Sequence, residues 1–189
     1  GFEANVIAYD KYKKGFGNKL VQVYYGEKLK NAADYEMMNS RNEAYKPAGL
    51  DNLNEPAIRM VHNDGNPSLA LNFISSEVKS ENENVKTTVI VLKDDQYPVE
   101  VKLFFKTYFN EDIIENWTEI KHNEGKPVML TNFASSMLSF KAREYWLTQF
   151  HGDWDKEMIM EESKLTSGIK IIDSKLGTRA NKFQAPLFF

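Results

Sequence analysis

The chain has 189 residues, enough for one domain with a sizeable hydrophobic core that needs neither disulfides nor metals. Hydrophobic residues make up 42% and charged residues 27%, the usual composition of a soluble globular protein. A net charge of −3 supplies no basic field, so we expect no nucleic-acid partner. The lack of cysteine excludes disulfides and thiolate chemistry and leaves the compartment open between cytoplasm, periplasm and exterior. No apolar run approaches the roughly 20 residues that span a bilayer, so we expect no membrane insertion.

Alternating apolar and polar residues dominate the first half of the chain. Residues 1–10 already have the pattern of a strand, whereas 31–41 is a short helix-like patch. Asn63-Asp64-Gly65 is a strong turn signal between two further strands. The strands expected in this half lie at 1–10, 18–29, 56–65 and 67–81.

The second half continues the same pattern. In residues 97–109, apolar side chains at 99, 101, 103 and 105 alternate with charged ones, which is typical of a half-buried strand, and Asp94-Asp95 marks a hairpin turn before it. The strands expected here are 85–95, 97–109, two long strands within 111–140 joined at 122–127, then 144–150, a stretch around Met158, and 167–174. About ten strands at hairpin spacing predict an all-β antiparallel sandwich, formed as a single domain over residues 1–189.

The segment 147–158, LTQFHGDWDKEM, concentrates polar side chains that could hold a metal ion. On a strand, His151, Asp153, Asp155 and Glu157 would share one face. However, Gly152 interrupts the strand, and no second histidine cluster exists in the sequence. We therefore interpret the segment as a polar strand end and expect neither a metal nor a cofactor.

Other candidate sites are equally incomplete. His62 and His122 each stand alone near a turn, and we interpret both as solvated turn residues. The sequence contains no nucleophile elbow, phosphate loop or dinucleotide fingerprint. Trp146 and Trp154 could stack on sugar rings, but we favour burial in the core. From its residues alone, the chain does not resemble a complete enzyme.

The order of several segments resembles the N-terminal domain of the α-galactosidases (melibiases) of glycoside hydrolase family 36. The segment 20–29 is similar to an early family strand that ends in a tyrosine–glycine turn, and 51–58 resembles a family loop of the type Gly-Asp-Phe-Arg-x-Pro-Ala. The further matching segments are 87–130, with its paired strands; 147–158, with the pattern Leu-x-Gly-x-Trp-x-Arg-Glu; and 165–189, with the Ser-x-x-Gly-Thr and Pro-Phe signature. In this resemblance Gly152, Trp154 and Glu157 are fold determinants.

The resemblance implies a galactose-mutarotase-like β-supersandwich that precedes a catalytic (β/α)₈ barrel. The two aspartates of the retaining reaction would lie in that barrel, so no catalytic residue is expected in this chain. Asn52, Leu53 and Asn54 match the Asp-Phe-Arg positions of the family loop and are the candidate substrate-rim residues. Because the charged and aromatic side chains of that loop are replaced, a plain surface loop ending at Pro56 is an equally open interpretation.

The implied partners are the enzyme's own barrel, an α-galactoside substrate acting through the full-length enzyme, and further copies in a homo-oligomer. We also expect the sandwich to be incomplete at its C-terminal end, since further family strands follow the Pro-Phe signature. The alternative is a free-standing carbohydrate-binding β-sandwich module. A sister specificity such as α-N-acetylgalactosaminidase also remains open, because specificity would lie in the barrel.

Overall fold

Strands make up most of the regular structure in the computed structural model, which describes all residues except 1–4, 15–16, 39–41, 50–53 and 174–183. The chain divides into two compact units, residues 1–140 and residues 141–189. The first contains β1 (Asn5–Lys14), β2 (Gly17–Glu27), α1 (Ala32–Glu36), β3 (Ile58–Val61), β4 (Leu71–Ser80), β5 (Val85–Asp94), β6 (Val99–Tyr108), β7 (Ile113–His122) and β8 (Met129–Phe133). The second contains β9 (Trp146–Asp153) and β10 (Lys156–Lys164). No helix among the described residues is long and apolar enough to cross a membrane.

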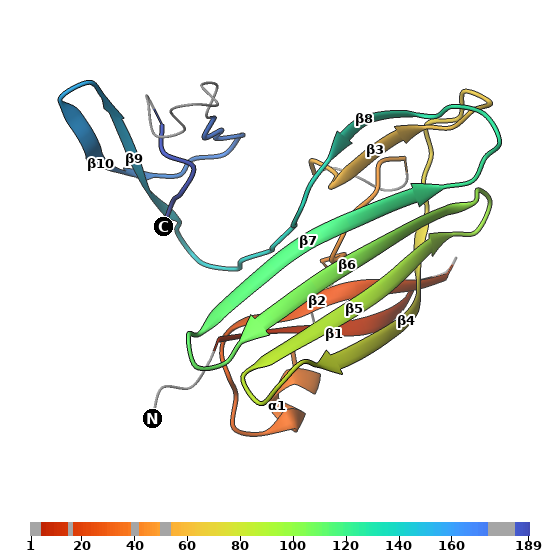
Figure 1. The fold of residues 1–189 in the computed structure, drawn as a ribbon, viewed down its shortest axis with the longest axis horizontal. Coiled ribbons are helices and arrows are strands. Elements are labelled where there is room, and N and C mark those ends of the chain that lie inside the picture. The colour runs from red at the N-terminus through yellow and green to blue at the C-terminus, as the bar shows by residue number, and fades with distance from the viewer. Residues whose placement is uncertain (1–4, 15–16, 39–41, 50–53, 174–183) are drawn as a thin grey trace. The chain divides into compact units, whose positions relative to one another are not determined.

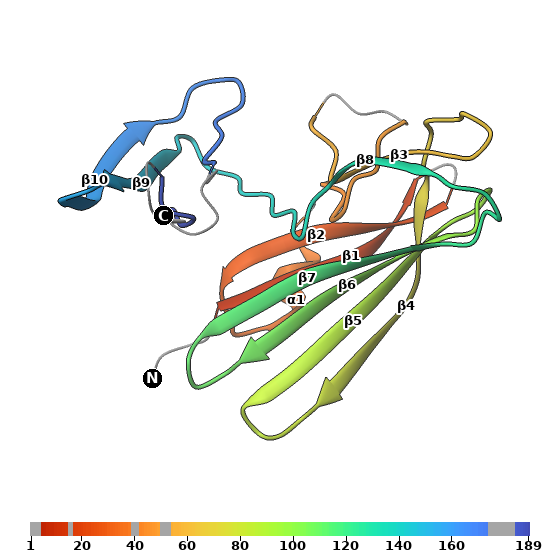
Figure 2. The same ribbon diagram turned by 45° about the horizontal axis from the view of Figure 1, so that its top comes forward.

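A four-stranded antiparallel sheet, β4-β5-β6-β7, is the centre of the first unit. Consecutive strands are joined as hairpins, and Val101 of β6 lies between Leu92 of β5 and Ile120 of β7. The expected alternation is confirmed, because 99, 101 and 103 are buried while the residues between them are only half-buried. The ribbon of β1 and β2 packs against one face of this sheet through contacts between β2 and β4 (Figures 1 and 2), which makes two layers.

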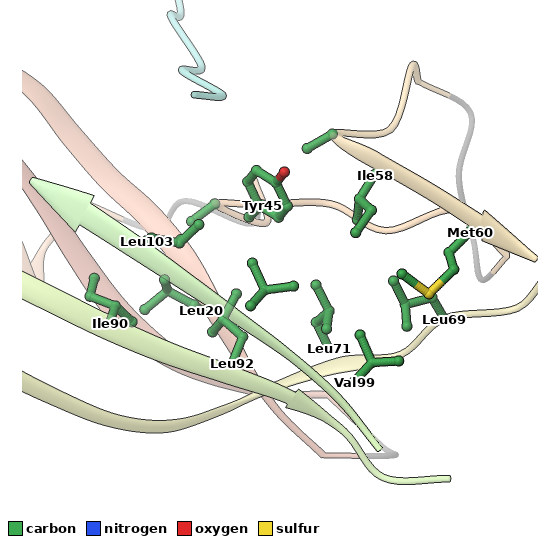
Figure 3. Close-up of a cluster of buried hydrophobic side chains, with 13 residues drawn as sticks. Leu20, Tyr45, Ile58, Met60, Leu69, Leu71, Ile90, Leu92, Val99 and Leu103 are labelled. Atoms are coloured by element: carbon green, nitrogen blue, oxygen red, sulfur yellow. The ribbon is translucent and has the colours of Figure 1, made fainter. Parts of the chain in front are cut away.

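The hydrophobic core lies between the sheet and the segments that cover it. Ile58 and Val101 are fully buried, and Tyr45 is only 2% exposed. In Figure 3, Leu92 and Val99 lie on the strands of the sheet, whereas Tyr45 and Ile58 come from the covering segment. The Tyr45 hydroxyl donates to the carbonyl of Ala134 at 2.8 Å, so its polar end is satisfied inside the core.

Two expected strands are shorter than the sequence suggested. The strand expected at 56–65 covers only Ile58–Val61, where β3 pairs with β8. The second strand expected within 111–140 is limited to Met129–Phe133. After Phe133, side chains of β7 replace a strand partner: Thr118 Oγ1 donates to the Ser135 carbonyl at 2.9 Å, and Asn116 Nδ2 donates to Ser136 Oγ at 2.7 Å.

The second unit is built on the antiparallel β9–β10 hairpin. The last residues of the chain cover the other edge of β9, where the backbones of Thr148 and Phe189 exchange two hydrogen bonds of 2.9 Å. The prediction of a strand at 167–174 is wrong for the described residues 167–173, which form no strand. There the Asp173 backbone N–H donates to the side chain of Gln184 instead of to a neighbouring strand.

Candidate functional site

The candidate substrate-rim loop, matched at residues 52–54, is described only in part. Asn52 and Leu53 lie outside the described residues, and Asn54 is exposed. Both ends of the loop are held by the core of the first unit: Ala48 N–H donates to the carbonyl of Ile58 at 2.9 Å, and Ala57 N–H donates to the carbonyl of Lys46 at 2.7 Å. The loop therefore leaves from a fixed base of buried backbone.

Gly49 permits the close approach with which the loop begins. Its φ angle is +117°, and a Cβ atom built there would lie 2.6 Å from Ser68 Cα. Real Cβ atoms do not approach backbone that closely, so only glycine fits without a shift of the chain. At the other end Pro56 is buried, and the Ala57 carbonyl accepts a 2.7 Å hydrogen bond from Ala134 N–H.

A buried polar network next to this base escaped the sequence interpretation. The His62 side chain is fully buried and the Glu124 side chain is 1% exposed. His62 Nδ1 lies 2.7 Å from Glu124 Oε1, Nε2 lies 2.9 Å from the Ser68 carbonyl, and the ring stacks on Tyr97 with centroids 3.6 Å apart. The prediction that His62 is a solvated turn residue is wrong, because its partner lies 62 positions away in the turn after β7.

The network fixes the connection between β3 and β4, residues 62–68, to the turns that flank β6 and β7. Glu124 Oε2 accepts the backbone N–H of Asn63 at 3.0 Å, and the Tyr97 hydroxyl donates to Asp64 Oδ2 at 2.8 Å. Both His62 nitrogens face oxygen atoms, so the ring and the Glu124 carboxyl together need two protons for these bonds.

Glu124 stays readily ionised in this setting. Burial raises the pKa of its carboxyl, but the hydrogen bonds from the Asn63 backbone and from His62, together with the charges of His62 and His122, outweigh burial. The pKa of Glu124 is therefore lowered from its ordinary value. The Ser68 carbonyl oxygen lies within hydrogen-bonding distance of His62, and Ser68 also lies against Gly49. The His62–Glu124 pair therefore helps to hold the base of the loop.

The polar residues of 147–158 lie on the β9–β10 hairpin and do not converge on an ion. His151 and Asp153 line a shallow cavity, Asp155 occupies the turn at a φ angle of +63°, and Glu157 is exposed. Within the part of the chain that the structure describes, no three His, Asp or Glu residues are grouped so that they could hold a metal.

Gly152 is a fold determinant of this hairpin, as the resemblance implies. A Cβ atom there would lie 2.5 Å from the Lys156 carbonyl oxygen, because β9 and β10 pass closely at the bulge. The preference for core tryptophans is wrong: Trp146 is 57% exposed and Trp154 is 79% exposed. Their exposure keeps carbohydrate stacking open as a role.

The antiparallel sheets around a buried apolar core characterise an all-β sandwich domain. A family model described as the glycosyl hydrolase family 36 N-terminal domain matches residues 18–189. The chain belongs to this family, and the resemblance found in the sequence is confirmed.

Individual relatives agree with the family match. The bifunctional alpha-galactosidase/sucrose kinase AgaSK of Mediterraneibacter gnavus is 22% identical over 198 residues, covering 87% of this chain and 21% of that protein. The GH36 alpha-galactosidase AgaA of Geobacillus stearothermophilus has the same fold over 100% of this chain and 30% of its own, with a TM-score of 0.84 and 18% identity. The alpha-galactosidase of Lactobacillus brevis matches with a TM-score of 0.82 and 17% identity, over 98% of this chain and 30% of its own.

These comparisons confirm the predicted fold class, an all-β antiparallel supersandwich. Variants of AgaA have been solved in complex with stachyose and with raffinose. The present chain spans less than a third of the solved relatives and about a fifth of the curated one. The single-domain boundary at 1–189, the incompleteness of the sandwich at its C-terminal end and the substrate-rim residues stay predictions.

We expect Gly49→Ala to destabilise the chain more than Gly65→Ala. Both glycines have positive φ angles, but a Cβ at Gly65 meets nothing within 4 Å, whereas one at Gly49 strikes the Ser68 backbone. Gly65→Ala should cost about 1–2 kcal/mol from backbone strain alone, and Gly49→Ala should cost more. Urea unfolding of the two variants measures the difference in their free energies of unfolding. Equal losses of stability would show that the backbone at Ser68 can move away from residue 49.

We expect the Glu124 carboxyl to titrate below the ordinary glutamate value of about 4.3. A pKa lowered on folding means that the ionised carboxyl stabilises the fold above the ordinary value, and that this contribution is lost as the pH falls through the lowered pKa. Carbon-13 NMR of the carboxyl measures the pKa directly.

His62→Gln should raise the pKa of Glu124, since burial stays while the neighbouring charge is removed. Glu81 is the control, because its lowered pKa depends on Lys106 and Thr87 and should not respond. A Glu124 pKa that is unaltered in the His62 variant would contradict the assigned pairing.

Proposed function

We propose that this chain is the non-catalytic N-terminal β-sandwich of a retaining α-galactosidase that hydrolyses terminal α-galactosides. The family match over residues 18–189 carries the proposal, because the matched family is itself defined by this domain. The relatives supply the activity by analogy: they are described as alpha-galactosidases, and two AgaA variants hold raffinose or stachyose. Supporting the catalytic barrel and forming contacts in a homo-oligomer are the expected tasks of the domain.

The acidic residues of the sandwich suit support better than catalysis. A retaining glycosidase needs one carboxyl group as nucleophile and a second as acid and base, about 5–5.5 Å apart across the glycosidic bond. Asp94 instead accepts the backbone N–H groups of Ala70, Gln96 and Tyr97, and Glu124 is closed in by His62 and Asn63. Carboxylates held in this way have no free side on which to meet a sugar carbon.

The rim of the substrate site is the second part of the proposal. Asn52, Leu53 and Asn54 occupy the positions of the family's Asp-Phe-Arg loop. The buried ends of the loop support this role, because a loop that starts from rigid backbone can present Asn54 at a constant position. Two asparagines would bind sugar hydroxyls through neutral amides where the family loop uses charges.

The purified chain should release no product from p-nitrophenyl α-galactoside above the rate in buffer. The reason is that both catalytic carboxyls are assigned to the barrel. The control is the complete polypeptide that contains this chain, which should hydrolyse the same substrate. Release of galactose by the isolated chain would contradict the proposal.

Replacing Asn52 and Asn54 together by alanine should raise the KM of the complete enzyme for raffinose and leave kcat unchanged. Each lost hydrogen bond is worth about 0.5–1.5 kcal/mol, which corresponds to roughly 2- to 10-fold in KM. Asn123→Ala, at an exposed position after β7, is the matched control. An unchanged KM in the double variant would assign residues 52–54 to a plain surface loop.

A further inference from the structure

A cavity on the second unit has no role in the function proposed above. It measures about 390 Å³ and opens on the face of the β9–β10 hairpin. Its polar lining comes from Gln149, His151, Asp153, Lys156, Glu161 and Gln184. The volume lies within the range of pockets that hold small ligands, about 300–1,000 Å³.

Gln149 gives this cavity an unsatisfied hydrogen-bonding group. The residue is 4% exposed, and its Nε2 donates to Glu161 Oε2 at 3.0 Å. Among the described residues its Oε1 atom has no hydrogen-bond partner. A buried amide oxygen without a donor is unfavourable, so a ligand hydroxyl that donates to it would be stabilised.

The charges of the lining favour a neutral ligand. Asp153 and Glu161 are offset in part by Lys156, and His151 Nδ1 lies 3.8 Å from Glu161 Oε2. The two carboxylates disfavour an anion, and the described residues include no group of three that could bind a metal. The cavity lining places hydrogen-bond donors and acceptors close together, which suits a molecule whose hydroxyl groups both donate and accept.

The turn that joins β9 to β10 holds a tryptophan next in sequence to a lining residue, although the Trp154 side chain is not itself part of the cavity lining. Asp153 and Lys156 both line the cavity, and they are joined by the two-residue turn Trp154-Asp155. The Trp154 backbone N–H donates to Asp153 Oδ1 at 2.7 Å, and Trp154 is 79% exposed. An exposed indole beside polar groups can cover the C–H face of a sugar ring while the polar groups bind its hydroxyls.

We propose that the hairpin cavity, with the buried Gln149 in its lining and Trp154 in the adjoining turn, binds one neutral hexose unit of an oligosaccharide. The bound ring packs on the indole, and its hydroxyls bond to Gln149, Glu161 and Asp153. This inference stands on the second unit alone. It does not depend on residues 52–54 or on where the catalytic carboxyls lie.

The test is a titration of the 189-residue chain with raffinose, followed by intrinsic tryptophan fluorescence and by calorimetry. Saturable binding with a dissociation constant of about 1 mM or tighter is expected. Trp154→Ala and Glu161→Gln should each weaken it at least about tenfold. Both positions are exposed, so these variants should keep the fold, and circular dichroism checks this. Gln149→Leu, which removes the buried amide, is a third variant.

Trp146→Ala is the matched control, since Trp146 is also an exposed tryptophan but lies at the start of β9, whereas Trp154 directly follows the lining residue Asp153 at its end. Its affinity for raffinose should equal that of the unaltered chain. The proposal is overturned if raffinose shows no saturable binding, if the Trp154 and Glu161 variants bind unchanged, or if the Trp146 variant loses as much affinity as they do. None of these outcomes bears on the hydrolysis assay, so the two proposals can fail separately.

Discussion

The first unit depends on covering the apolar face of its four-stranded sheet. Alternation places Val99, Val101 and Leu103 on one face, and an uncovered face of that kind would not be stable in water. The cover comes from β2 and from the segment around Tyr45 and Ile58. Since the Tyr45 hydroxyl bonds to the carbonyl of Ala134, it also ties the irregular chain after β8 to the core.

The same cover determines what the first unit can present to a partner or a ligand. Backbone hydrogen bonds hold the chain at Ala48 and again at Ala57, while the described residues between them include the exposed Gly49, Asn54 and Glu55. The His62–Glu124 pair secures the neighbouring connection between β3 and β4 through Ser68, against which Gly49 lies. The buried Glu124 carboxylate therefore holds the backbone in place. In the proposed function, the chemical step belongs to the catalytic barrel.

The strands could be predicted from sequence because their signal is local. The period of two in 97–109 shows which side chains share a face of the sheet. Asp94 could be predicted as a turn residue because an aspartate carboxylate accepts hydrogen bonds from nearby backbone N–H groups, as it does here. The family loop at 51–58 could likewise be matched from its order alone, although its interior lies outside the described residues. The pattern alone does not supply a strand partner: the second strand expected within 111–140 ends at Phe133, and the described part of the strand expected at 167–174, residues 167–173, forms no strand.

Burial of single polar or aromatic residues could not be predicted, because it depends on partners far away in the sequence. His62 looks like a turn histidine until Glu124 is placed beside it. Trp154 looks like a core residue until β9 and β10 pair and leave it in their two-residue turn. Gly152 carried a clearer signal, since a glycine inside a strand often marks a close approach of backbone.

Amide hydrogen exchange in increasing urea tests most directly whether one core holds the sheet and its cover together. The account predicts that the amides of Ile90, Leu92 and Val101 in the sheet, and the cover amides of Ala48 and Ala57, open with one common free energy. A cover that opens separately, at a much lower free energy than the sheet, would contradict it.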